Sequence, residues 1–244
     1  MTRELWREKA LNFKPQNTTD WRFNYMSTFE IVKNNEAVKT YITRADESLC
    51  ALGFTEHSFA HVTRTAEDAG YVLRTLGYPE RDVELAQIAG YLHDIGNLVN
   101  RANHALSGAA MAFSLLGSLG FEAADIATIT TAIGNHDEGT GFPVNPVCAA
   151  LILADKSDVR RTRVRNPEIS NFDIHDRVNY SVKKSTLKIN EDQTLIKLKL
   201  SVDTKYGSVM DYFEIFLHRM IMCRKAAERL NLEFKLIVNE KQLI

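Results

Sequence analysis

The chain contains 244 residues, of which 45% are hydrophobic and 25% are charged, and its formal net charge is −1. A chain of this length can bury one large core, so we expect one large domain or a domain with a small appendage. The near-zero net charge excludes a global electrostatic attraction to nucleic acid or membranes, so that any anion-binding surface must be local.

The cysteines and the N-terminal segment indicate in which cellular compartment the protein is expected. Cys50, Cys148 and Cys223 are odd in number and far apart, which indicates a reducing compartment and argues against a cysteine metal site. The N-terminal segment MTRELWREKALNF has no apolar stretch of signal-peptide length, and no other stretch approaches a membrane span. We therefore expect a cytoplasmic protein without a membrane partner.

The first two thirds of the chain show helical periodicity. Residues 1–28 are polar and are expected to form an arm, followed by helices over about 29–52, from a cap at Thr55 to Gly77, and from Pro79 to 92. Further apolar helical stretches are expected at 103–119, 123–133 and 147–158. Five or six successive helices without strand signals are typical of a helical bundle.

The pattern changes after Pro167. Apolar and polar residues alternate from Leu195 to Val202, which predicts a strand, and residues 190–193 are expected to form the turn that precedes it. A helix over 209–230 and an alternating run over 234–238 follow, giving a β-β-α-β order. The expected fold class is mainly α, a helical bundle with a small C-terminal α+β appendage. The expected divisions are an arm and helix (1–50), a helical core (51–166) and the appendage (167–244).

Histidines and aspartates recur on the apolar helices. Any one of them alone is explained by an ordinary structural role, but burying several imidazoles and carboxylates is costly unless they are paired or bound to metal. A helical bundle can bring such residues into one pocket. The set is His61, His93, Asp94, His104, His136 and Asp155. A second His-Asp pair, His175-Asp176, lies in a polar stretch without further histidines or aspartates on apolar helices. We therefore expect a capping or ion-pair role for it.

The order H…HD…H…H…D over roughly residues 52–165, with the segments HDIG, NHALSGA and ILADKSDV, resembles the HD-domain metal-dependent phosphohydrolases. The resemblance implies a first metal held by His61, His93, Asp94 and Asp155, and a second held by His104 and His136. Asp94 would bridge both ions, which relieves their repulsion, and a bridging water would be acidified. Two divalent cations are thus expected. Imidazole and carboxylate ligands suit iron, manganese, zinc, cobalt or nickel, with magnesium also open, and dinuclear relatives favour iron or manganese.

Basic residues follow the last aspartate of this set. If the helix continues, Lys156, Arg160 and Arg163 share one face and could bind phosphoryl oxygens, with Arg161 beside them; a solvated basic face is the equal alternative. His57, one helical turn before His61, could donate a proton to the leaving group or have only a structural role. The expected catalytic residues are Asp94, His57 and Lys156, and the expected substrate-binding residues are Asn97, Lys156, Arg160 and Arg161.

Three branches of the family, which differ in their substrates, have motifs that can be compared with this sequence. Cyclic dinucleotide phosphodiesterases carry HDIGK, His-His-Glu and GYP, whereas this chain has HDIGN, His136-Asp137-Glu138 and GTGFP. Asn97 thus stands where those phosphodiesterases have a lysine. The alarmone hydrolases carry a Glu-Asp pair after the HD motif, whereas the nearest Glu-Asp pair of this chain, Glu67-Asp68, precedes it. Diadenosine tetraphosphate hydrolases are the nearest in ligand content. We expect hydrolysis of a small nucleotide-like phosphate ester or anhydride, with cyclic dinucleotide cleavage as an alternative.

A regulatory module remains a second hypothesis. The chain could keep the metal pocket but sense a nucleotide through its C-terminal appendage with little turnover. The strand at 195–202 or the helix at 209–230 could also form a homodimer contact. The expected partner is a small phosphorylated molecule, and no nucleic-acid partner is expected.

Overall fold

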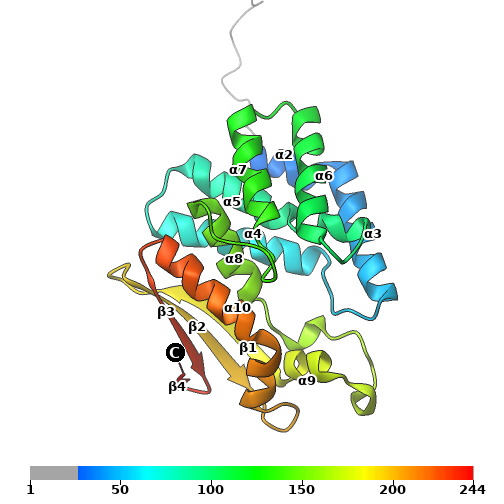
Figure 1. Cartoon of the computed structure of the whole chain (residues 1–244), viewed down its shortest axis with the longest axis vertical. Helices are drawn as coiled ribbons and strands as arrows, with labels where there is room; N and C mark the ends of the chain where they lie inside the picture. Colours follow the sequence, from blue (N-terminus) through cyan, green and yellow to red (C-terminus); the bar gives the residue numbers. More distant parts are fainter. Residues whose placement is uncertain (1–26, 244) are drawn as a thin grey trace, which may run out of the picture.

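The computed structural model describes residues 27–243, so the arm expected over residues 1–28 lies almost entirely outside the described part (Figure 1). The helical part comprises α2 (Thr28–Asn34), α3 (Glu36–Ala51), α4 (Phe59–Thr75), α5 (Glu80–Leu92), α6 (His104–Ser118), α7 (Ala123–Gly134) and α8 (Pro146–Ser157). It is followed by α9 (Ile174–Ser181), β1 (Val182–Ile189), β2 (Leu195–Val202), α10 (Val209–Arg229), β3 (Glu233–Val238) and β4 (Lys241–Gln242). Short 3-10 turns are η1 (Ile95–Leu98), η2 (Arg161–Arg163) and η3 (Ile169–Asn171).

Helix α8 forms the centre of the bundle. Residues 147–154 are each 2% exposed or less, because this helix is apolar on all sides and is surrounded by α4, α5, α7 and α10. Asn145 caps its first turn by accepting a hydrogen bond from the backbone amide of Cys148. The last turn of this buried helix carries Asp155, which fixes the position of that carboxylate.

Two glycines allow the backbones around His93 and Asp94 to approach closely. A Cβ atom at Gly90 would lie 2.8 Å from the Cα atom of Ala66, so α5 packs directly on α4. A Cβ atom at Gly96 would lie 2.0 Å from the carbonyl oxygen of His104, so η1 packs against the start of α6. These contacts bring the end of α5 against the middle of α4, and η1 against the start of α6.

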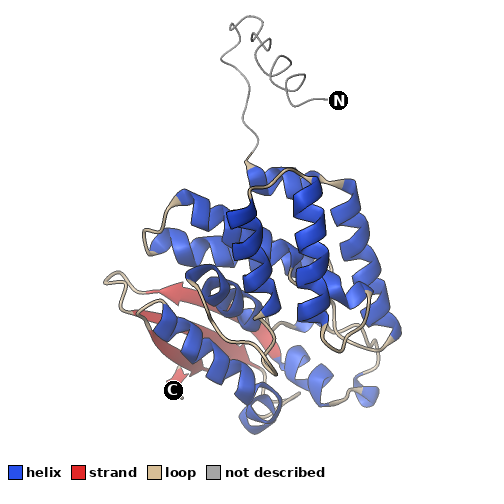
Figure 2. Cartoon of the chain, turned by 45° about the horizontal axis from the view of Figure 1, so that its top comes forward, coloured by secondary structure: helices blue, strands red, loops and turns tan. Residues whose placement is uncertain are grey.

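The C-terminal part forms a four-stranded sheet in the order β1-β2-β3-β4. Strands β1 and β2 are antiparallel, β2 and β3 are parallel and joined through α10, and β3 and β4 are antiparallel. Helix α10 crosses the sheet and also packs on α8 (Figures 1 and 2). The helical bundle with a C-terminal β-β-α-β appendage is thus confirmed. Strand β4 was not predicted, because two residues show no periodicity.

Helix ends account for most local differences from the expectations. The N-cap of α4 is Ser58 and not Thr55, so His57 precedes the helix and does not share a face with His61. Helix α8 ends at Ser157, and Arg160 has extended backbone angles. The prediction that Lys156, Arg160 and Arg163 share one helical face is therefore wrong. Among the described residues, no helix has the length and apolar character needed to cross a membrane.

Candidate metal centre

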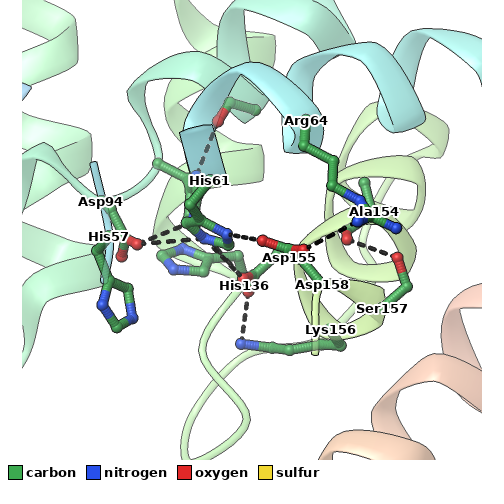
Figure 3. A network of polar contacts seen from close by, with 12 residues as sticks. His57, His61, Arg64, Asp94, His136, Ala154, Asp155, Lys156, Ser157 and Asp158 are labelled. Carbon is green, nitrogen blue, oxygen red and sulfur yellow. Dashed lines mark hydrogen bonds and ion pairs between the residues drawn. The ribbon is translucent and has the colours of Figure 1, made fainter. Parts of the chain in front are cut away.

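The six expected metal ligands converge on one point from five elements. His61 lies in the first turn of α4, His93 and Asp94 directly follow α5, and His104 begins α6. His136 follows α7, and Asp155 lies in the last turn of α8. Asp94 and all four histidines are at most 5% exposed. Figure 3 shows His61, Asp94, His136 and Asp155 directed toward one another from these elements.

Each of the four histidines is held through its Nδ1 atom by an oxygen acceptor. The partners are Asp158 Oδ2 for His61 (2.8 Å), the Gly90 carbonyl for His93 (2.8 Å), the Arg101 carbonyl for His104 (3.2 Å) and the Ile133 carbonyl for His136 (2.6 Å). These oxygens require a proton on Nδ1, so in the neutral ring Nε2 carries a lone pair. All four Nε2 atoms are therefore available as metal ligands.

The Nε2 atoms approach one another in two pairs. His61 and His93 have Nε2 atoms 3.3 Å apart, and those of His104 and His136 are 3.2 Å apart. Two facing lone pairs repel unless a cation lies between them. Two nitrogens bound to one ion at about 2.1 Å lie roughly 3.0–3.4 Å apart for coordination angles between square and tetrahedral. The residues present therefore fit a cation at each pair.

The carboxylate of Asp94 connects the two pairs. Its Oδ2 atom lies 3.1 Å from Nε2 of His93, and its Oδ1 atom lies 3.6 Å from Nε2 of His104. Asp155 Oδ1 lies 3.4 Å from Nε2 of His61, on the side of the first pair. Two groups have ligand atoms within 4.8 Å of one another, His61, His93 and Asp155 in one and His93, Asp94 and His136 in the other. These two groups share His93, and Asp94 lies between the two histidine pairs, so the residues can hold divalent metal ions.

Asp158 supports the first pair and was not predicted. Its carboxylate is 1% exposed, accepts from His61 Nδ1, and also accepts from Arg160 Nε at 2.9 Å. Burial alone would raise the pKa of Asp158, but the His61 hydrogen bond and the charges of Arg163 and Arg160 outweigh it and lower the pKa. A carboxylate behind a ligating histidine fixes the tautomer and orientation of the ring. The motif ILADKSDV contained this residue, but its role depends on the chain leaving the helix after Ser157.

A chain of alternating charges connects Asp155 to the C-terminal appendage. Lys156 Nζ lies 2.8 Å from Asp155 Oδ2 and 2.6 Å from Glu138 Oε2. Arg219 of α10 donates from Nε to Glu138 Oε1 at 2.9 Å. Burial alone would lower the pKa of Lys156, but the charges of Asp155 and Glu138 outweigh it and raise the pKa. Lys156 therefore stays protonated and holds Asp155 in place, and Figure 3 shows it directed at this carboxylate.

The other expected site residues have distinct positions. Asn97 is buried and donates from Nδ2 to Asp94 Oδ1 at 3.0 Å, so it orients the bridging carboxylate. Arg160 is paired with Glu56 at 3.1 Å as well as with Asp158. Arg161 donates from Nε to the Tyr180 carbonyl at 2.6 Å and stacks on that ring, because the chain turns away after α8. None of these three side chains lines the cavity beside the candidate metal ligands.

A cavity of about 390 Å³ opens onto the candidate metal ligands Asp94, His104, His136 and Asp155. Its walls come from both parts of the chain. The other lining residues are Leu52, Gly53, Phe54, Thr55, His57, Arg101, Glu138, Lys156 and Arg163 from the helical part, and Asp173, His175, Asp176, Asn179, Ile215, Phe216 and Arg219 from the C-terminal part. The volume is near the lower end of the range of small-molecule sites.

The second His-Asp pair lies in this cavity without joining a metal group. Among the described residues, neither group of candidate metal ligands contains His175 or Asp176. Asp173 caps α9, and Asn166 Nδ2 lies 3.5 Å from Asp176 Oδ2. Sequence reasoning gave no reason to place α9 beside the ligands, because only the packing of the appendage on the bundle brings it there.

Comparison with known proteins agrees with this geometry. Residues 58–162 match the family model described as HD domain. This segment is an HD domain. The family is one of metal-dependent phosphohydrolases that bind divalent metal ions, and its matched range contains all six converging ligands. The chain is also 25% identical to the uncharacterized protein MJ1020 of Methanocaldococcus jannaschii, across 73% of this chain and 76% of that protein.

Proposed function

We propose that the chain is a two-metal phosphohydrolase that cleaves a phosphate ester or anhydride of a small, nucleotide-like molecule. The proposal rests on two pairs of histidines whose Nε2 atoms face each other, with the carboxylate of Asp94 beside both pairs. The first ion would be held by His61, His93, Asp94 and Asp155, and the second by Asp94, His104 and His136. Iron or manganese is the proposed metal, because imidazole and carboxylate ligands without thiolate suit several divalent metals and the dinuclear members of the family that the sequence resembles favour these two.

The bound cations would activate a water and neutralise phosphoryl oxygens. The chain itself supplies the orientation of their ligands. Asn97 fixes one oxygen of Asp94, and Lys156 fixes one oxygen of Asp155. Because Lys156 is buried between two carboxylates, we assign it to positioning and not to substrate binding.

Arg101 is the cation that we assign to the substrate phosphate. It lines the cavity, its guanidinium lies 5.4 Å from the centre of the Phe54 ring, and its NH1 atom donates to Asn97 Oδ1 at 3.3 Å. Among the described residues, no carboxylate lies within 4.0 Å of it, so its charge is free for an anion. An arginine at such a position can bind two phosphoryl oxygens at once.

The rest of the cavity suits the organic part of the substrate. Leu52 and Phe54 offer apolar surface, with Phe54 40% exposed. Asp176 and Asn179 of α9 offer hydrogen-bonding groups to hydroxyls or to a base. His57 also lines the cavity, and its Nδ1 atom lies 2.7 Å from the Thr55 carbonyl. Burial holds the pKa of His57 well below its ordinary value, so the neutral ring offers Nε2 to the substrate as a hydrogen-bond acceptor and does not supply a proton to the leaving group.

The decisive experiment combines a substrate panel with metal analysis. Protein purified with its metals is tested against phosphomonoesters, nucleotides, dinucleoside polyphosphates and cyclic dinucleotides, beside Asp94→Asn and the exposed control Asp192→Asn. We expect about two metal equivalents and turnover that only Asp94→Asn abolishes. Nucleotide binding without turnover on any substrate would favour the regulatory module, and turnover confined to cyclic dinucleotides would favour that alternative.

A further inference from the structure

The outward face of the C-terminal sheet carries an unusual arrangement of lysines. Strands β2 and β3 alternate strictly, so that Ile196, Leu198 and Leu200 point inward toward the protein core. Helix α10 packs on the inward side of β2 and β3. The outward positions of β1, β2 and β3 form what we call the lysine face, which comprises Lys184, Lys188, Lys197, Lys199 and Lys235.

The strand register places like charges side by side on this face. Lys188 pairs with Lys197 across β1 and β2, and Lys197 pairs with Lys235 across β2 and β3. Three ammonium groups therefore follow one another across three strands that are about 4.8 Å apart. Like charges directly opposite each other destabilise a sheet, so the isolated fold gains nothing from this row.

The lysine face has few internal counter-charges. Lys235 lies 3.6 Å from Glu233, whereas the other four lysines form no ion pair within 4.0 Å among the described residues. Since the chain as a whole has a net charge of −1, this positive surface is a local feature and not a sign of a basic protein. A polyanion would neutralise several of these charges at once.

The shape of the surface narrows the choice of polyanion. A hollow of about 440 Å³ is lined by two lysines and one carboxylate, together with polar and apolar residues: Lys184, Lys199, Glu240, Thr186, Ser201, Asn239, Leu200 and Ile237. A flat bilayer contacts protruding groups and not a hollow, and duplex DNA is stiff over about 150 base pairs. A flexible single strand can follow the hollow and place successive phosphates over lysines about 6.7 Å apart along a strand.

We propose that the lysine face binds the phosphodiester backbone of a single-stranded nucleic acid. The outward positions of β1–β3 are lysine, threonine, serine, leucine, isoleucine and glutamate, without an aromatic ring on which bases could stack. Binding is therefore electrostatic, with little base preference and strong dependence on salt. The site is separate from the metal centre and does not depend on the hydrolase proposal.

The test is a fluorescence-anisotropy titration with a labelled single-stranded oligonucleotide over a range of salt concentrations. Full engagement of five lysines predicts a slope of about −3.5 for log K against log salt. The variant Lys188→Gln/Lys197→Gln/Lys199→Gln removes three of these contacts, so its slope falls to about −1.4 and its affinity falls on the order of 100-fold at about 0.1 M salt. Gel analysis checks that the strand stays intact.

A matched control removes the same charge elsewhere. The variant Lys33→Gln/Lys39→Gln/Lys225→Gln lies on helices outside the lysine face and should bind like the unmodified protein. Relief of repulsion also predicts that the lysine-face variant melts at the same temperature or higher, which excludes misfolding as the cause of lost binding. Equal loss in both variants, absence of binding at low salt, or tighter binding to duplexes or anionic vesicles would overturn the proposal.

Discussion

Replacing Asp158 by Asn tests how the first metal pair is built. The substitution keeps the shape of the side chain but removes the charge behind His61 and beside Arg160. Carboxylates in this position typically contribute 10- to 100-fold to metal affinity, which is about 1.4–2.7 kcal/mol. The metal affinity of the second pair should change little, because His104 and His136 are held by backbone carbonyls and not by Asp158.

The assay is a competition titration with a chelator, followed by elemental analysis of bound metal. We expect one equivalent to be lost at chelator concentrations 10- to 100-fold lower than in the unmodified protein, while the other equivalent stays. Asp203→Asn, which removes a surface carboxylate paired with Lys183, serves as the control. Equal weakening of both equivalents, or no weakening at all, would refute the assignment of Asp158 to one pair.

Three further predictions follow from contacts around the cavity. Arg101→Ala should raise KM at least tenfold in steady-state kinetics without changing metal content, and a loss of metal would contradict the phosphate-binding role. Arg219→Met removes one of the two cations that contact Glu138 and should lower the free energy of unfolding, measured in urea, by about 1.5–3 kcal/mol. An unchanged midpoint of urea unfolding would show that this hydrogen bond does not contribute to stability. Burial alone would raise the pKa of Glu56, but the Ser58 hydrogen bond and two arginine charges lower it below its ordinary 4.5. Its contribution to stability is therefore present above about pH 4.5 and is lost as the pH falls through the folded pKa, so Glu56→Gln should flatten the acid limb of a stability curve, and an unaltered limb would refute this.

Periodicity predicted the elements because it depends on local geometry. The strict alternation of Ile196, Leu198 and Leu200 specified a strand with one buried face, and the apolar run from residue 147 to 154 specified a central helix. Helix ends were less well predicted. Whether the chain leaves the helix after Ser157 depends on tertiary contacts of Asp158, which periodicity does not record.

The order of histidines and aspartates indicated a metal centre, and residues 58–162 match the HD domain. The sequence could not reveal the second partners of these residues. Asp158 behind His61, Arg219 on Glu138 and Arg101 over Phe54 join positions that are 97, 81 and 47 residues apart, and only packing brings them together.

The sequence by itself determined which residues can ligate metal and which faces are apolar, because composition and local period fix these properties. The tertiary structure decided which charges meet. It turned Lys156 from a substrate-binding candidate into a positioning group between Asp155 and Glu138, and it brought His175 and Asp176 to the wall of the cavity. Long-range packing and strand register are properties of the folded chain, so they are absent from any local pattern.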